Sequence, residues 1–293
     1  MALEDKFVNP LTDFGFKKLF GTEPNKELVI DFLNQLLPEK HKIEDLTYSN
    51  NETVGLTQID RKAIFDLHCK SSNGDRFIVE IQKAKQNFFK DRSVYYSTFP
   101  IQEQAKKGEW NYKLSAVYTV GILDFIFEDD RKEKDLIYRI QLKDQDCEVF
   151  FDKLTYIYIE LPKFTKGEMD LETRFDKWLY VLRHLSELQN RPKTLQDKIF
   201  KKLFEAAEIA NFSLEDRQAY EDSLKYYRDL KNVVDTSREK GIEEGKIEGR
   251  KEGKIEGKIE GKIEVAIELK KNKVPVEIIM KSTGLTKEEI ENL

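Results

Sequence analysis

Two acidic residues on neighbouring predicted strands are the strongest candidates for catalytic groups in this chain. Asp66 follows an apolar pair, and Glu80 and Gln82 lie in an apolar run, with the pair Asn73-Gly74 between the two segments. Asn-Gly between two β-forming runs predicts a hairpin. Alternate residues share one face of a strand, so Glu80 and Gln82 point the same way and Asp66 can lie opposite or diagonal to them.

Two carboxylates that meet among apolar residues favour a cation between them. Burying like charges is costly unless a cation neutralises them. Hard oxygen ligands suit Mg²⁺, which keeps several waters and can orient one of them for attack on a phosphodiester. The residue types therefore suit metal-assisted phosphodiester hydrolysis, although an exposed, solvated pair of acids is the commoner cause of the same sequence pattern.

Basic residues follow the acidic pair. Residues 81–92 contain four basic residues and one acidic residue. Such a local surplus suits the phosphate backbone of DNA, even in a protein whose net charge is −5. The candidate DNA-binding residues are Lys85, Lys90, Arg92 and Tyr96, with ordinary packing on a helix face an equal alternative for the tyrosine.

These residues and their surroundings resemble the PD-(D/E)xK nuclease superfamily and, more closely, its recombination-promoting nuclease and putative transposase family. The matching text is an opening TDFGFKKLFG, then IFD, a hairpin, VEIQ, and a helix carrying Arg92, Tyr95, Tyr96 and Gln104 that ends at Gly108 before Trp110 and Tyr112. The resemblance covers roughly residues 1–165. It implies an α/β fold of the restriction-endonuclease type, with a mixed β-sheet flanked by helices.

The resemblance also implies a role for each candidate. Asp66 and Glu80 are expected to bind the metal, the Ile81 carbonyl is expected as a third ligand, and Gln82 takes the place usually held by lysine. The expected ion is Mg²⁺, with Mn²⁺ or Ca²⁺ as alternatives. The implied activity is that of a Mg²⁺-dependent DNA endonuclease of recombination or mobile-element movement, which hydrolyses phosphodiesters with a metal-activated water.

Glutamine at position 82 leaves a second function open. A lysine there would supply a positive charge, whereas Gln82 only exchanges hydrogen bonds. The alternative is a catalytically weak or inactive DNA-binding and assembly protein. Lys17 and Lys62 are candidates for a substitute cation, while strand alternation predicts Lys83 on the opposite face. Asp13 is expected either to cap the first helix or to face the site.

The elements that position these residues alternate in type. The pattern predicts two short helices within 13–37, strands over 46–54, 63–70 and 76–84, a helix over 88–107 that Pro100 kinks or splits, and strands over 114–127, 136–142 and 154–161. Glu160, at the end of the last strand, is expected to be solvated. We assign residues 1–165 to a nuclease-like core on this pattern.

The remainder of the chain is predicted to be helical. Residues 166–237 form a helical region of about three amphipathic segments, with Ser213 as an N-cap. Residues 238–264 repeat Gly-Lys-Ile-Glu with a period of four, and each glycine costs about 1 kcal/mol relative to alanine in a helix. This segment is either a coiled-coil-like stalk that joins copies of the chain or a partly helical linker. Residues 265–293 predict a small helical hairpin, with Thr286 and Glu289 as a capping box.

Composition limits the remaining functions. Two cysteines among 293 residues give neither a zinc clip nor a disulfide framework. The longest apolar run is far shorter than the roughly 20 residues that span a bilayer. No secretory signal or phosphate-binding glycine loop is recognisable. We therefore expect a cytoplasmic protein without a membrane segment or a nucleotide cofactor, whose partners are DNA and, through residues 238–264, further copies of itself.

Overall fold

The computed structural model describes residues 5–49, 66–105, 108, 110–127 and 135–293, together with the backbone of 52–53 and 63–64. The chain divides into two compact units, Met1–Lys231 and Asn232–Leu293. The boundary lies within one long helix, so each unit is described by itself. Unit 1 holds the β-sheet and all the candidate site residues.

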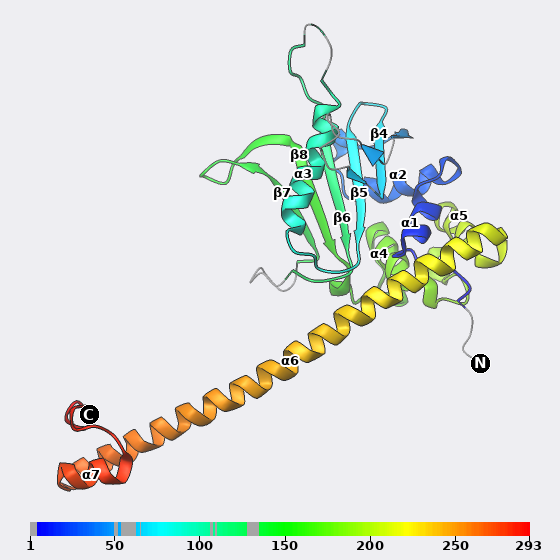
Figure 1. Ribbon diagram of the computed structural model, residues 1–293. Coiled ribbons are helices and arrows are strands. Elements are labelled where there is room, and N and C mark those ends of the chain that lie inside the picture. The colour runs from blue at the N-terminus through cyan, green and yellow to red at the C-terminus, as the bar shows by residue number, and fades with distance from the viewer. Residues whose placement is uncertain are drawn as a thin grey trace. The chain divides into compact units, whose positions relative to one another are not determined.

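A mixed six-stranded sheet forms the centre of unit 1 (Figure 1). Its order is β1 (Leu46–Tyr48), β4 (Leu67–Ser71), β5 (Arg76–Gln82), β6 (Val117–Leu123), β8 (Val149–Glu160) and β7 (Ile137–Lys143). The pairs β5·β6 and β6·β8 are parallel, and the other pairs are antiparallel. A separate short pair joins β2 (Glu52–Thr53) to β3 (Ala63–Ile64). The predicted restriction-endonuclease-like α/β sheet is confirmed.

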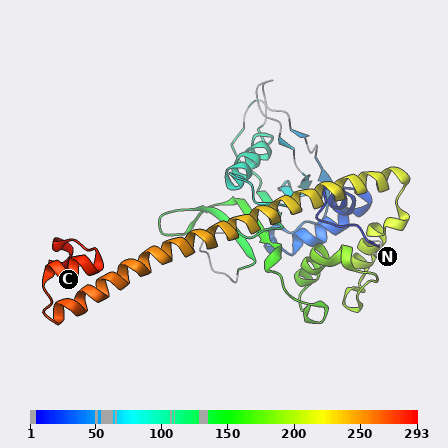
Figure 2. The same cartoon turned by 60° about the horizontal axis from the view of Figure 1, so that its bottom comes forward.

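Helices cover both faces of the sheet. One face carries α1 (Asp13–Phe20), α2 (Lys26–Asn34), α4 (Arg174–His184) and α5 (Lys198–Ala207), and the other carries α3 (Phe89–Gln102). Both views show α1 and α2 beside α5, although more than 160 positions separate α2 from α5 in sequence (Figures 1 and 2). Trp178 of α4 lies among the rings of Phe20, Phe32 and Phe200, at centroid distances of 5.1–5.8 Å. This aromatic core joins segments from both ends of unit 1.

Strand alternation divides β5 between the two faces. Phe77, Val79 and Ile81 belong to the core with α1, α2, α4 and α5, whereas Ile78 packs against Phe99 of α3. Because side chains alternate along a strand, Glu80 and Gln82 share the α3 face with Ile78. Both faces of β5 and β6 are covered, which explains why residues 77–79 of β5 and most of β6 are apolar.

Short helical turns link these elements. The 3-10 turns are Glu23–Asn25, Glu39–His41, Leu161–Lys163, Glu168–Asp170, Leu185–Glu187, Lys193–Leu195 and Ile209–Asn211. Ser213 caps the following helix, since its Oγ accepts a hydrogen bond from Asp216 N at 3.1 Å. The predicted cap is confirmed.

Three local predictions need correction. The helix α3 is continuous through Pro100 and ends at Gln102; the proline lies in the last turn, where it removes the one hydrogen bond that its own N–H would donate to the carbonyl four residues earlier. The last strand begins at Val149, since its first residues pair with β7 in a hairpin. Glu160 is buried rather than solvated: it pairs with Lys163 at 2.6 Å and accepts a hydrogen bond from Phe127 N at 2.5 Å.

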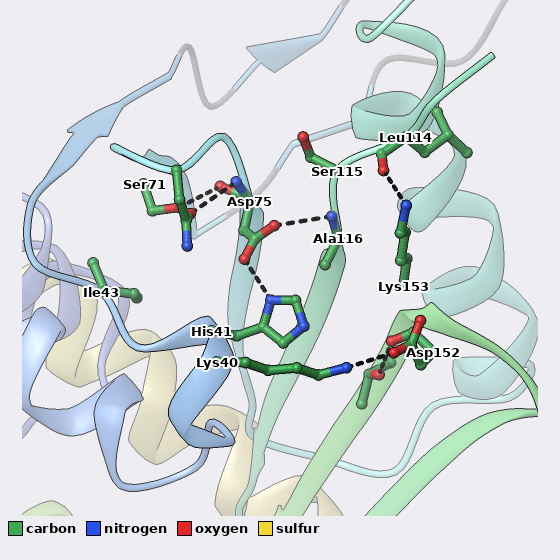
Figure 3. Close-up of polar contacts among 12 residues, drawn as sticks. Lys40, His41, Ile43, Ser71, Asp75, Leu114, Ser115, Ala116, Asp152 and Lys153 are labelled. Carbon is green, nitrogen blue, oxygen red and sulfur yellow. Dashed lines mark hydrogen bonds and ion pairs between the residues drawn. The ribbon is translucent and has the colours of Figure 1, made fainter. Parts of the chain in front are cut away.

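A polar network fixes the end of β5 that is remote from Glu80 (Figure 3). Asp75, in the turn before β5, lies with Oδ2 2.7 Å from His41 Nδ1, and its Oδ1 accepts a hydrogen bond from Ala116 N at 3.0 Å. Nearby, Lys40 pairs with Asp152 at 2.6 Å, and Lys153 Nζ donates to the Leu114 carbonyl at 2.9 Å. The buried Asp75 carboxylate thus links the β4–β5 turn to the start of β6.

Unit 2 is helical. The helix α6 (Leu214–Lys271) begins in unit 1 and runs through the whole Gly-Lys-Ile-Glu repeat, and α7 (Val276–Thr283) and α8 (Lys287–Glu291) follow. Ile279 and Ile290 pack on Ala266 as a small core. Thr286 and Glu289 form the predicted capping box. Across the residues described, no helix has the length and apolar character needed to cross a membrane.

Candidate active site

Asp66 and Glu80 lie at the end of the β4–β5 hairpin. The register pairs Leu67 with Val79, and one further step places Asp66 opposite Glu80. Asp66 Oδ2 accepts a hydrogen bond from Ile81 N at 2.7 Å. The hairpin therefore presents two carboxyl groups from adjacent strands at one position.

Burial makes this acid pair electrostatically unfavourable. Burial is the larger cause and the negative charge of Asp66 the smaller cause that together raise the pKa of Glu80 to about 8. The positive charge of Arg92 lowers this pKa. The pKa of Asp66 is also raised, chiefly by burial, although the Ile81 N–H, Lys17 and Lys83 counteract it. Among the described residues, Glu80 Oε1 is buried with no hydrogen-bond partner. Burial and the repulsion between the two carboxylates therefore disfavour the ionised pair in the absence of a metal ion.

The donor set fits a hard divalent cation. A cation beside Glu80 would satisfy Oε1 and offset the repulsion between the two carboxylates. Within the described ranges, no group of three or more His, Cys, Asp or Glu side chains is arranged to bind a metal. Mg²⁺ does not require such a group, since it is commonly bound through one or two carboxylates and retains several waters.

The backbone of Ile81 points toward the same place. In a β-strand the N–H and C=O of one residue project to the same side, and successive residues alternate. The Ile81 N–H donates to Asp66, whereas the Gln82 carbonyl accepts from Asp124 N on the β6 side. The Ile81 carbonyl is therefore directed to the side where Asp66 lies, as a third metal ligand requires.

Arg92 of α3 supplies a positive charge next to Gln82. The Gln82 side chain is buried, donates to the Ala84 carbonyl at 2.9 Å and accepts a hydrogen bond from Arg92 Nη2. The same Nη2 lies 3.9 Å from Glu80 Oε2, and Arg92 Nη1 donates to Gln86. The guanidinium also stacks on Tyr96, with Cζ 5.7 Å from the ring centroid. Gln82 therefore orients the Arg92 guanidinium and carries no positive charge itself.

The sequence did not indicate this contact. Arg92 is a candidate from the local charge and from the family resemblance, and neither indicates a contact with Gln82, ten positions earlier. The contact exists because α3 crosses the face of the sheet that carries Glu80 and Gln82. An arginine near the start of a helix that follows the acidic strand is the signal that could have suggested it.

Charged residues of α1 and of the segment just after β5 also influence the pKa of Asp66. Lys17 of α1 and Lys83, just after β5, both favour its ionised form, and Asp13 disfavours it. Lys83 Nζ lies 5.4 Å from the Tyr226 ring centroid, and Asp13 pairs with Lys17 at 3.1 Å. Strand alternation predicts Lys83 on the face opposite Glu80, and its charged neighbours Asp13 and Lys17 belong to α1; from there its charge still lowers the pKa of Asp66.

Two further predictions concern Asp13 and Lys62. Asp13 is not the cap of α1, because Thr12 Oγ1 accepts the hydrogen bond from Gly15 N. Lys62, one of the two predicted substitute cations, lies outside the described residues. The other, Lys17, is described and lowers the pKa of Asp66.

The predicted DNA-binding residues fall into two groups. Arg92 and Tyr96 lie beside the acid pair. The pKa of Tyr96 is raised chiefly by burial and secondly by the charge of Glu80. Lys85 and Lys90 are exposed and line a shallow pocket at the start of α3, where Lys90 Nζ lies 5.2 Å from the Phe127 ring centroid. The first group is part of the candidate active site, and the second borders it.

Comparison with known proteins yields one match. A family model described as PD-(D/E)XK nuclease family transposase matches residues 10–237. No curated protein and no solved structure matches the chain. The match confirms the family resemblance and extends past residue 165, through α4, α5 and the first turns of α6.

Proposed function

The chain belongs to the PD-(D/E)XK nuclease family transposases, and from this membership we propose that it is a Mg²⁺-dependent DNA endonuclease of recombination or mobile-element movement. The observation that carries the proposal is the Glu80 carboxyl group opposite Asp66, which is 14% exposed and whose Oε1 is buried and unsatisfied among the described residues. The proposal places the protein in the cytoplasm, with DNA as its substrate.

Asp66, Glu80 and the Ile81 carbonyl would hold the ion. Mn²⁺ and Ca²⁺ are alternative ions, because the same oxygen ligands suit them. When bound, a divalent ion supplies a Lewis acid for the phosphodiester and a water of lowered pKa. The hydrogen bond from Ile81 N holds the Asp66 carboxylate in place, so the ligand does not need to reorganise on binding.

Arg92 takes the role that a lysine at position 82 would have. Its guanidinium lies between Gln82 and Glu80, fixed by the amide oxygen on one side and by the Tyr96 ring on the other. A prepositioned cation stabilises the negative charge that develops on a phosphate during cleavage. Lys85, Lys90 and Tyr96 would hold the DNA strand beside the acid pair, with the two lysines on phosphates.

Nicking of supercoiled plasmid tests the proposal. We expect the purified full chain to nick plasmid in Mg²⁺ and to lose this activity in EDTA. Asp66→Asn and Glu80→Gln keep the side-chain shape and remove the charge, so either should reduce the rate by at least about 100-fold. Equal nicking by the parent and both variants would mean that the activity does not come from this site, and DNA binding without cleavage would favour the assembly protein.

A separate observation supports self-association through residues 238–264. Along the repeat, α6 exposes Ile242, Ile247, Ile255 and Ile259, each 46–60% exposed. Exposed isoleucines on a helix favour burial against another helix, and because a period of four drifts about 40° per unit, these side chains wind around α6. The repeat glycines have open space at the Cβ position in the isolated chain, which leaves room for a close approach.

Light scattering tests self-association directly. Deleting residues 241–264 should lower the mass of the particle if copies associate through the repeat. An unchanged mass would exclude the stalk. Circular dichroism of the shortened chain shows whether the rest of the protein stays folded.

A further inference from the structure

An uninterrupted row of residues runs across the sheet from Glu80. The register pairs Glu80 with Gly121, Gly121 with Tyr158, and Tyr158 with Tyr138. A Cβ atom at Gly121 would lie 2.9 Å from Tyr158 Cδ1. Glycine at this position therefore allows the Tyr158 ring to lie over β6, toward the candidate active site.

Beyond Gly121 the same face of the sheet opens into a pocket of about 180 Å³. Its walls include the rings of Phe127, Tyr138, Tyr156 and Tyr158, and we call it the aromatic pocket. Val94 of α3 lines it from the other side and is 54% exposed. The aromatic pocket is therefore accessible along α3, beside the site.

Hydrogen bonds at the rim fix the aromatic walls. The Tyr156 hydroxyl lies 2.8 Å from Ser97 Oγ, and the Tyr158 hydroxyl is hydrogen-bonded to Ser93, one turn earlier on α3. Tyr138 Oη accepts a hydrogen bond from Lys163 Nζ at 2.9 Å. The rings are thus held before any ligand arrives, which lowers the cost of binding a rigid planar group.

The charge of the lining points to a particular ligand class. Among the described residues that line the aromatic pocket, Lys90 is the charged one. Stacked rings beside a cation suit a planar aromatic group attached to a phosphate, as in a nucleotide. An apolar side chain of a protein partner would make no use of the Lys90 charge.

We propose that the aromatic pocket receives one unpaired nucleobase of the strand whose phosphodiester lies at Asp66 and Glu80. This inference rests on the proposed function and adds a substrate class to it: DNA with unpaired nucleotides, in preference to continuous duplex. Two strand spacings, about 10 Å, separate Glu80 from Tyr158. That distance corresponds to roughly three stacked nucleotides at 3.4 Å each. A base in a duplex would have to leave its stack to enter.

Binding to two single strands of equal length tests the proposal without cleavage. One strand carries thymine bases and the other consists of abasic sites, so both offer the same phosphates. We expect the full chain in EDTA to bind the base-bearing strand about 5- to 150-fold more tightly, the range for stacking one base. Fluorescence anisotropy of labelled strands gives both dissociation constants.

Variants connect this preference to the aromatic pocket. Tyr138→Ala removes one wall, and Val94→Trp fills the pocket from an exposed position, so both should abolish the preference while binding to the abasic strand persists. Tyr138→Phe keeps the ring and should keep the preference. Phe150→Ala is the matched control, because Phe150 is an 81% exposed aromatic residue of β8 that does not line the pocket.

The outcomes separate this inference from the proposed function. Equal affinity of the parent for both strands, or a preference that survives in both Tyr138→Ala and Val94→Trp, overturns the inference and leaves the aromatic pocket to a protein side chain. Binding to neither strand overturns the inference, while nicking of plasmid in Mg²⁺ decides the proposed function separately. A base preference in a protein that never cuts plasmid in Mg²⁺ supports the pocket and contradicts the nuclease.

Discussion

Arg92 of α3 places its guanidinium 3.9 Å from the Glu80 carboxylate, the group whose pKa burial raises most clearly in the candidate site. The two residues come from different elements, and Gln82 joins them by accepting a hydrogen bond from the same guanidinium nitrogen. Gln82 and Arg92 therefore act as a pair, in which one residue positions the charge that the other carries.

This pairing predicts a specific double-mutant result. Arg92→Ala should reduce plasmid cleavage by about 100-fold or more, because it removes the cation beside the acid pair. Gln82→Lys alone should give no gain, since two cations would then meet at one position. In the Arg92→Ala background, however, Gln82→Lys should restore part of the activity. Additive losses in the double variant would contradict the pairing.

The raised pKa of Glu80 predicts how stability depends on pH. In the fold this pKa is about 8, against an ordinary value of 4.5, so between these two values the folded state binds more protons than the unfolded state. The free energy of unfolding should therefore fall as pH rises from 4.5 to 8 and level off above 8.

Glu80→Gln should remove this dependence. Without divalent ions, the variant should be more stable than the parent at pH 9 by on the order of 2–4 kcal/mol, and the difference should shrink toward pH 5. Urea unfolding at both pH values measures it. A difference in the free energy of unfolding between parent and variant that is the same at pH 5 and pH 9 would contradict the burial of an ionisable group at position 80.

The same carboxyl group controls the pH dependence of metal affinity. A carboxyl must lose its proton to bind a cation, so Mg²⁺ affinity should rise by up to about tenfold per pH unit toward pH 8 and then level off. Calorimetric titration from pH 6 to pH 9 follows this change. Affinity that does not vary with pH would exclude Glu80 as a ligand.

The network at the other end of β5 predicts a difference in stability between two acids. Asp75→Ala should cost about 1–3 kcal/mol, because it leaves the Ala116 N–H buried without an acceptor. Asp152→Ala is the control from the same region (Figure 3). Its ion pair with Lys40 is about half exposed, so its loss should cost about 0–1 kcal/mol. Thermal unfolding compares the two, and equal losses would contradict the network.

Local patterns were sufficient to predict much of the fold. The Asn73-Gly74 turn and the alternation in β5 predicted the hairpin that brings Asp66 opposite Glu80. The helical spacing of apolar residues and the capping residues before it predicted Ser213 and Thr286 as helix caps. These features depend on residues close in sequence, so neighbouring side chains determine them.

Contacts between distant segments were beyond the sequence. The buried state of Glu160 depends on the backbone of Phe127, 33 positions away, and the position of Arg92 depends on how α3 crosses the sheet. The aromatic pocket likewise combines α3 with two strands, β7 and β8, and the segment that follows β6. Strand order and helix placement decide all three, and a single sequence does not reveal either.

Direct measurement of metal binding tests the central claim, that Asp66 and Glu80 form a divalent-ion site. Isothermal titration of the full chain with Mn²⁺ at pH 8, beside the double variant Asp66→Asn/Glu80→Gln, gives the affinity and the number of ions. We predict saturable binding at this site in the parent, displaced by Mg²⁺ and absent from the folded double variant. Identical titrations of the two proteins would contradict the claim.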